Sequence, residues 1–143
     1  MTIYTIGYEG ATMDGFIAAL HETGVRRVID VHGLPLSRRP GFSNSTLAAS
    51  LKAEGIDYVH LKALGTPKPG RDAAKKGDVA TLTAVYDAQL DLPKAQIAAA
   101  RMLALADELP SALLCYERNP CHCHRTLLLG AVGKGRAVVD LYV

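Results

Sequence analysis

The stretch SALLCYERNPCHCHRTLLL, Ser111 to Leu129, passes from a short apolar run through a polar loop into a second apolar pattern. The run Ser111–Glu117 has the length and composition of a buried strand, and the pattern from His124 onward is typical of a helix. A strand followed closely by a helix is the repeating unit of a parallel α/β sheet. The stretch therefore predicts a parallel α/β fold, with all three cysteines of the chain gathered around one strand-to-helix connection.

The same alternation runs along the whole chain. Apolar runs rich in Val, Ile and Tyr predict five strands, at Ile3–Tyr8, Arg26–Gly33, Ile56–Leu64, Ser111–Glu117 and Arg136–Val143. Helical patterns lie between them, at Thr12–Gly24, from Ser43 or Asn44 to Gly55, at Val79–Leu90, at Pro93–Leu109 and at His124–Gly135. Strands this apolar are covered on both faces. We therefore expect one domain, residues 1–143, built as a three-layer α/β/α sandwich around a mainly parallel sheet of these five strands.

Composition narrows the class of protein. The 143 residues are enough for one core without crosslinks, and the net charge of +2 is too small to argue for nucleic-acid binding. No run of roughly eighteen apolar residues and no leader pattern is present, so we expect a soluble, cytoplasmic protein without a membrane partner. Three cysteines are an odd number, which favours reduced thiols over a disulfide framework.

One stretch is locally basic. Between Lys62 and Lys76 five Lys or Arg residues stand against one acid, Asp72, and the Pro and Gly residues at 67–70 predict a loop. A solvated surface loop is the plainer interpretation. The alternative is a mobile arm that touches a polyanion.

Four loops are expected to meet at one edge of the sheet, because the carboxyl ends of parallel strands lie together and ligands usually bind there. We expect the segments after the first, second and fourth strands to form one pocket, with Arg38 and Arg125 side by side. The four loops are Gly7–Gly10, His32–Phe42, Gly65–Arg71 and Cys115–Leu128.

These segments, in this order, resemble the family catalogued as domain of unknown function 488, over essentially the whole chain. The resemblance is carried by IYTIGYEG, VIDVHGLPLSRRPGFS, GIDYVHLKALGTP and LLCYERNPCHCHR. In that family the second segment usually reads Asp-Val-Arg and then Pro-x-Ser-Arg, and the fourth reads Cys-x-Glu, a spacer and Cys-His-Arg. His32 stands where an arginine is usual. The resemblance implies the fold and the pocket but no reaction, and the matching positions are Asp30, Pro35, Ser37, Arg38, Cys115, Glu117, Cys123, His124 and Arg125.

The Cys- and His-rich loop allows several chemical interpretations. Structural zinc sites favour pairs of Cys-x₂₋₄-Cys knuckles, which the contiguous residues Cys121–His124 do not match, so we expect no metal. A mixed set of Cys115, Cys123 and His124 stays open as the alternative. Cys123 is also a candidate nucleophile, because it stands at the mouth of a helix beside a cation.

Most of the remaining residues are suited to an anion-binding pocket. His124 and Arg125 open a helix whose unpaired amides favour negative charge. Arg38 and Arg39 belong to the loop after the second strand, so guanidinium groups would approach from two sides. Tyr8 could stack on a base.

Two carboxylates belong to the same edge. Glu117 is a candidate catalytic acid or base, and Asp30 could serve likewise or orient the arginines. The structural alternative is a salt-bridge network that joins Asp30 or Glu117 to Arg38 or Arg125.

Two classes of function therefore stay open. In the first, the protein is an enzyme that acts on a phosphorylated or nucleotide-like substrate, nucleic acid included. In the second, it is a binding or sensor module for the same small anion, with a redox- or metal-sensitive loop. The sequence identifies no cofactor and no oligomeric state.

Overall fold

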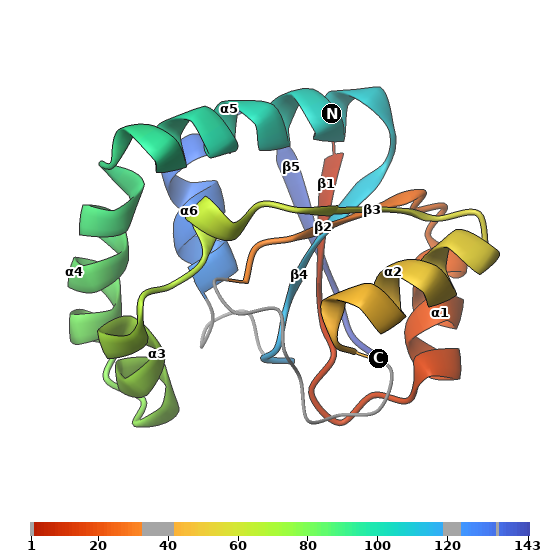
Figure 1. Cartoon of the computed structure of the whole chain (residues 1–143), viewed down its shortest axis with the longest axis horizontal. Helices are drawn as coiled ribbons and strands as arrows, with labels where there is room; N and C mark the ends of the chain where they lie inside the picture. The colour runs from red at the N-terminus through yellow and green to blue at the C-terminus, as the bar shows by residue number, and fades with distance from the viewer. Residues whose placement is uncertain (1, 33–41, 119–123, 134) are drawn as a thin grey trace.

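The computed structural model describes residues 2–32, 42–118, 124–133 and 135–143 (Figure 1). The strands in these residues form one parallel sheet in the order β3-β2-β4-β1-β5. β4 is the central strand, and β1 and β2 pair with it on either side. The strands are β1 (Thr2–Gly7), β2 (Arg27–Asp30), β3 (Asp57–His60), β4 (Ser111–Cys115) and β5 (Ala137–Leu141).

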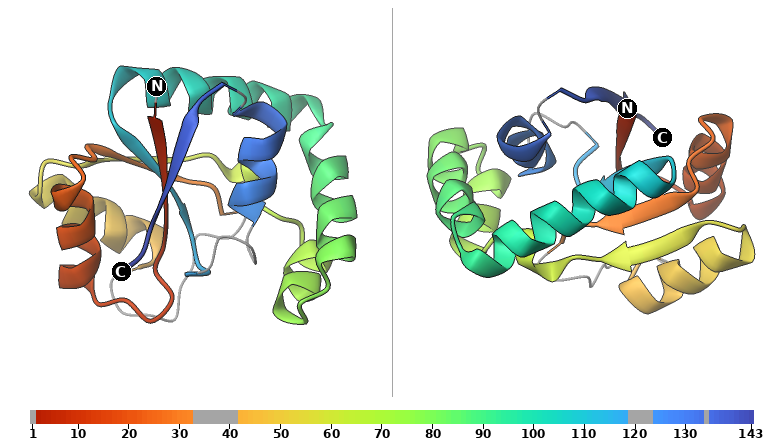
Figure 2. Two further views of the ribbon diagram at one scale, coloured as in Figure 1. Left: turned by 180° about the vertical axis from the view of Figure 1, so that it is seen from behind. Right: turned by 90° about the horizontal axis from the view of Figure 1, so that it is seen from above.

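Helices cover both faces of the sheet, as Figure 2 shows. One layer consists of α1 (Met13–Glu22) and α2 (Asn44–Ala53), and the other contains α4 (Val79–Leu90), α5 (Pro93–Glu108) and α6 (His124–Val132). The predicted three-layer α/β/α sandwich is confirmed. No helix in the described part of the chain is long and apolar enough to span a membrane.

Each face of the sheet has its own apolar core, because side chains alternate along a strand. In β4, Leu114 packs toward α1 and α2, whereas Leu113 packs toward α5 and α6. The first core includes Ile6, Phe16, Leu20, Val28, Leu47 and Leu51, and the second includes Ile3, Ile29, Tyr86, Met102 and Leu128.

The basic stretch is more ordered than the sequence predicted. The strand expected at Ile56–Leu64 ends at His60 and is followed by a 3₁₀ turn, η1 (Lys62–Leu64), and then by a helix, α3 (Lys68–Lys75). Proline is tolerated in the first turn of a helix, where its missing N–H has no partner to lose. Gly70 is buried, and a Cβ there would meet Thr66 Cγ2 at 2.4 Å. Close packing through this glycine therefore stabilises a helix where composition alone predicts a loop.

The chain changes sides at the centre of the sheet. After β2 it enters α2 on one face, and after β4 it enters α6 on the other. β2 and β4 are neighbours, so their exits diverge to opposite faces. In open α/β sheets ligands usually bind at the carboxyl ends of such a strand pair. Here those ends are Asp30 and Cys115.

Gly7 allows a close approach between two of these exits. A Cβ at Gly7 would lie 1.8 Å from the carbonyl oxygen of Glu117. In the structure the place beside it is filled by the chain itself, so Gly7 positions the segment that carries Glu117.

We predict that Gly7→Ala lowers the free energy of unfolding by roughly 1–3 kcal/mol or more, because backbone and not a flexible side chain must move. Gly130→Ala is the matched control. It lies in α6 with no atom within 4 Å of the added Cβ, and it should raise stability by up to about 1 kcal/mol. Urea unfolding measures both, and equal stabilities for the two variants would contradict the close approach.

Candidate functional site

The exits of β1, β2 and β4 are joined by backbone hydrogen bonds. The amide of Tyr8 donates to the Cys115 carbonyl at 3.3 Å, and the amide of Glu9 donates to the Tyr116 carbonyl at 2.8 Å. On the other side of β4, the amide of Val31 donates to the Leu114 carbonyl at 3.4 Å. The three segments therefore lie together at the carboxyl edge, as the sequence predicted. Arg38, Arg39 and Cys123 lie outside the described residues.

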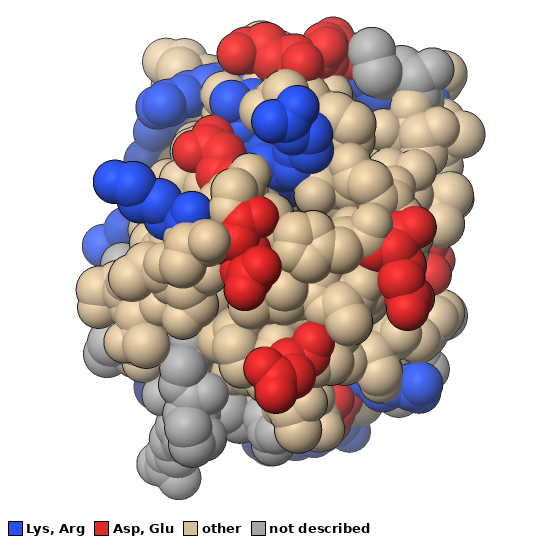
Figure 3. Space-filling view, turned by 90° about the vertical axis from the view of Figure 1, so that its right-hand side faces the viewer, with Lys and Arg blue, Asp and Glu red and all other residues tan. Residues whose placement is uncertain are grey.

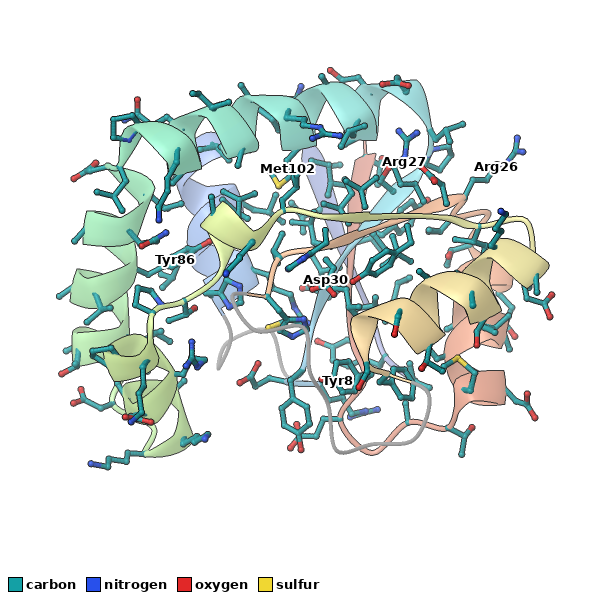
Figure 4. All side chains as sticks on the ribbon, in the orientation of Figure 1. Tyr8, Arg26, Arg27, Asp30, Tyr86 and Met102 are labelled. Atoms are coloured by element: carbon teal, nitrogen blue, oxygen red, sulfur yellow. The ribbon has the colours of Figure 1, made fainter. Side chains whose placement is uncertain are left out.

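Asp30 is a buried carboxylate with both oxygens occupied (Figure 4). Oδ1 accepts hydrogen bonds from the His32 amide at 3.0 Å and from His32 Nδ1 at 2.6 Å, and Oδ2 accepts one from the Tyr58 hydroxyl at 2.5 Å. Burial alone would raise the pKa of Asp30, but the hydrogen bonds and charge of His32 and the Tyr58 hydroxyl hold it below 3.8. Asp30 is therefore ionised at neutral pH and orients its neighbours.

His32 is a site residue that the sequence did not identify. In the sequence it stood out only because it replaces an arginine that is usual in the family. Its Nδ1 faces Asp30, and its carbonyl accepts a hydrogen bond from His60 Nε2 at 2.8 Å. Its Nε2 is buried and has no hydrogen-bond partner among the described residues. The signal available in the sequence was the spacing of Asp30 and His32, two residues apart within the strand predicted at Arg26–Gly33, which would place them on one face.

Arg125 is completely buried. One Nη2 hydrogen bond, 3.1 Å long, reaches the Arg118 carbonyl, but Nε and Nη1 have no partner among the described residues. No ion pair in the described part of the chain joins Arg125 to Asp30 or Glu117. The salt-bridge network that the sequence allowed between these described residues is therefore absent, and Asp30 is paired with His32 instead.

Glu117 lies within electrostatic range of His32 and Arg125. Burial raises the pKa of its carboxyl group, while the charges of His32 and Arg125 act in the opposite direction. Its Oε2 lies 3.1 Å from Cys115 Sγ. A carboxyl group in this setting holds a proton more readily than one in water, which suits it to donate to an anion.

The state of Cys115 differs from the prediction of reduced thiols. Cys115 is disulfide-bonded, and its partner lies outside the described residues. The physical reason is local: the chain that enters α6 returns to the end of β4, where Cys115 Sγ lies 3.7 Å from His124 Nδ1. The described residues contain no group of three or more potential metal ligands of the His, Cys, Asp and Glu types. Because Cys121, His122 and Cys123 are outside them, the metal-free state stays a prediction.

His124 was expected to help hold an anion, but in the structure its hydrogen bond is a structural one. It is buried, its Nε2 donates to the Val31 carbonyl at 2.7 Å, and its ring meets Tyr86 edge-on at 5.1 Å. Burial lowers its pKa to about 4. A neutral imidazole that ties α6 to the exit of β2 supplies no positive charge at neutral pH.

Tyr8 is equally enclosed. Its ring stacks on Phe42 at 4.7 Å and meets Tyr116 and His32 edge-on at 5.3 and 5.9 Å. The face expected to stack on a base is thus covered by Phe42. Tyr8 is therefore a buried packing residue of the site, whereas the Tyr116 side chain is exposed to solvent beside it.

Other surfaces are less suited to an anion. At the amino edge of the sheet, a cavity of about 220 Å³ is lined by Thr2, Tyr4 and the end of α5, where Asp107 and Glu108 contribute negative charge. Figure 4 shows Arg27 near that edge, far from Tyr8, and its guanidinium is bound to Asp57 at 2.7 Å. Figure 3 views the layer of α1 and α2, where charges of both signs are mixed. A polyanion-binding surface carries one sign.

Comparison with known proteins yields one match. The family model described as Domain of unknown function DUF488 covers residues 12–132. The chain belongs to the DUF488 family. No curated protein and no solved structure matches it. The family match spans Asp30, Glu117 and Arg125, but its description assigns no activity to them.

The buried neutral state of His124 predicts a pH dependence of stability. Its folded pKa of about 4 lies below the unfolded value of 6.5, so the unfolded chain binds the proton more tightly. Stability should therefore fall as the pH is lowered from 6.5 to 4, by about 3 kcal/mol from this group. His124→Gln retains a donor toward Val31 and cannot titrate.

Urea unfolding at several pH values provides the measurement. The His124→Gln variant should show a flatter profile between pH 6.5 and 4 than wild type, whatever its absolute stability. Parallel profiles for the two proteins would show that His124 is already charged in the native state.

Proposed function

We propose that the carboxyl edge of the sheet binds a phosphate- or nucleotide-like anion, either as a small molecule or as part of a nucleic acid. The observation that carries this proposal is the burial of Arg125, whose Nε and Nη1 have no hydrogen-bond partner in the described part of the chain. A guanidinium is always charged and presents its donors in a planar fork that matches phosphate oxygens.

The energetic cost of burying donors without partners supports the binding of an anion at Arg125. A buried polar group without a partner costs about 1–3 kcal/mol, and more if it is charged. A structural arginine normally avoids this cost through a carboxylate, but Arg125 has no ion pair with any described residue. An anion that accepts from Nε and Nη1 would satisfy both donors and neutralise the charge.

Neighbouring groups fit the same ligand. His32 Nε2, a third buried nitrogen without a partner among the described residues, belongs to the same edge, and Glu117 can donate when protonated. Arg38 and Arg39 belong to the proposed site on sequence grounds, and Cys123 is retained as a candidate nucleophile. These three residues lie outside the described part of the chain.

We predict that inorganic phosphate, or a nucleotide found by screening, raises the melting temperature of wild type. A ligand present at a hundred times its Kd stabilises the native state by about 2.7 kcal/mol. Arg125→Ala should lose this gain. Arg125→Lys retains the charge without the planar fork and should bind more weakly while the fold survives.

Arg101→Ala provides the matched control, because Arg101 is an exposed arginine on α5. It should retain the ligand-dependent gain of wild type in full. The proposal is wrong if Arg125→Ala lowers the melting temperature while wild type gains nothing from phosphate or from any nucleotide.

A second candidate function, a redox-responsive binding module, is favoured by the disulfide at Cys115. Cys115 Sγ lies 3.1 Å from Glu117 Oε2, so a change in the sulfur alters the surroundings of a carboxyl group at the anion site. Reduction would replace the disulfide by a thiol that can donate to that oxygen.

This candidate predicts that Cys115 reacts with iodoacetamide in denaturant only after dithiothreitol treatment. It also predicts that reduction changes the apparent Kd for phosphate in wild type but not in Glu117→Gln. Labelling of Cys115 without reductant, or a Kd that is the same in both redox states, contradicts it.

A further inference from the structure

The pairing of Asp30 and His32 has the geometry of a proton-transfer pair. The carboxylate of Asp30 accepts from His32 Nδ1 at 2.6 Å, and this hydrogen bond places the proton of a neutral imidazole on Nδ1. The other ring nitrogen, Nε2, is then a bare acceptor. A carboxylate that sets the tautomer of a histidine in this way prepares it to act as a general base.

Both members of the pair are held in place by other elements. The Tyr58 hydroxyl in β3 donates to Asp30 Oδ2, and burial together with the charge of Asp30 raises the pKa of Tyr58, so it stays a donor. His60, also in β3, donates to the His32 carbonyl. The Tyr8 ring meets the imidazole edge-on. The orientation of His32 is therefore defined from two neighbouring segments.

His32 and Arg125 act on the same space. His124 Nε2 donates to the Val31 carbonyl at 2.7 Å, and Arg125 and His32 are the next residues in these two segments. Both also lie within electrostatic range of Glu117. Each presents unpaired, buried nitrogen toward this edge of the sheet: Nε2 from His32, and Nε and Nη1 from Arg125. A bare acceptor and cationic donors at one edge of the sheet match a reaction in which an anion is held while a proton is removed.

We infer that His32 Nε2, oriented by Asp30, takes a proton from water that attacks a phosphate ester held by Arg125. This inference rests on the proposed anion site and names its substrate class. The water oxygen forms a bond to phosphorus as its proton passes to Nε2. The bond from phosphorus to the leaving oxygen breaks, and the imidazolium returns the proton to that oxygen, so water is the sole co-reactant.

The tautomer of His32 tests the pair without any substrate. Long-range ¹H–¹⁵N correlation spectra of wild type should show His32 with the proton on Nδ1, whereas His60 and His124 should carry it on Nε2. His32→Gln assigns the signal. Asp30→Asn should shift His32 to the Nε2–H tautomer. An Nε2–H or doubly protonated His32 in wild type at pH 8 overturns the inference and makes His32 a donor to the anion instead.

Hydrolysis of p-nitrophenyl phosphate and bis(p-nitrophenyl) phosphate tests the reaction. Wild type should turn over at least one of the two probes, and His32→Gln and Asp30→Asn should lower kcat by about 10²–10⁴-fold. Tyr58→Phe, which leaves both members of the pair in place, should lower kcat less. Asp91→Asn, an exposed carboxylate at the end of α4, is the matched control and should retain wild-type activity.

The failure of this inference differs from the failure of the proposed function. If phosphate stabilises wild type against melting but neither ester is hydrolysed, the anion site stands and the proton-transfer role of His32 is wrong. If His32→Gln retains wild-type kcat on a probe that Arg125→Ala no longer turns over, His32 is again excluded as the base.

Discussion

The contact of Gly7 with the Glu117 carbonyl is the constraint on which the carboxyl edge depends. The exit of β4 crosses the end of β1 at a distance that leaves no room for a Cβ, and the amides of Tyr8 and Glu9 then bond to the same crossing segment. This crossing positions Glu117 beside Cys115 at the carboxyl edge. The chain then continues into α6, on the face of the sheet opposite α1 and α2. The positions of the groups that carry the proposed chemistry thus depend on the backbone contact between the exits of β1 and β4.

The two buried histidines at this edge show how one residue type is given opposite properties. His124 bonds through Nε2 to a carbonyl, which can only accept, so burial leaves it neutral with a pKa of about 4. His32 bonds through Nδ1 to a carboxylate, and its buried Nε2 has no hydrogen-bond partner among the described residues. A structural histidine differs from a reactive one in its hydrogen-bond partner and in the ring nitrogen that binds this partner, more than in its burial.

Much of the fold could be predicted from the sequence, because the neighbouring strands β2 and β4 are buried throughout and helices begin at recognisable caps such as Thr12, which accepts from the Gly15 amide. α3 could not, because its helical state depends on the packing of Gly70 against Thr66 and Val85, from a turn and a helix outside it. The sequence likewise placed Asp30, Glu117 and Arg125 at one edge. It could not assign their charges, since these depend on partners such as Tyr58 that only the fold brings near.

The hydrogen bond from Arg125 to the Arg118 carbonyl joins the start of α6 to the end of the β4 exit. This contact holds residues 118 and 125 close together in the chain between β4 and α6. The entropy of closing a loop grows only logarithmically with length, by about 0.6 kcal/mol for each doubling. A hydrogen bond that joins the two ends of a connection is therefore compatible with connections of very different length.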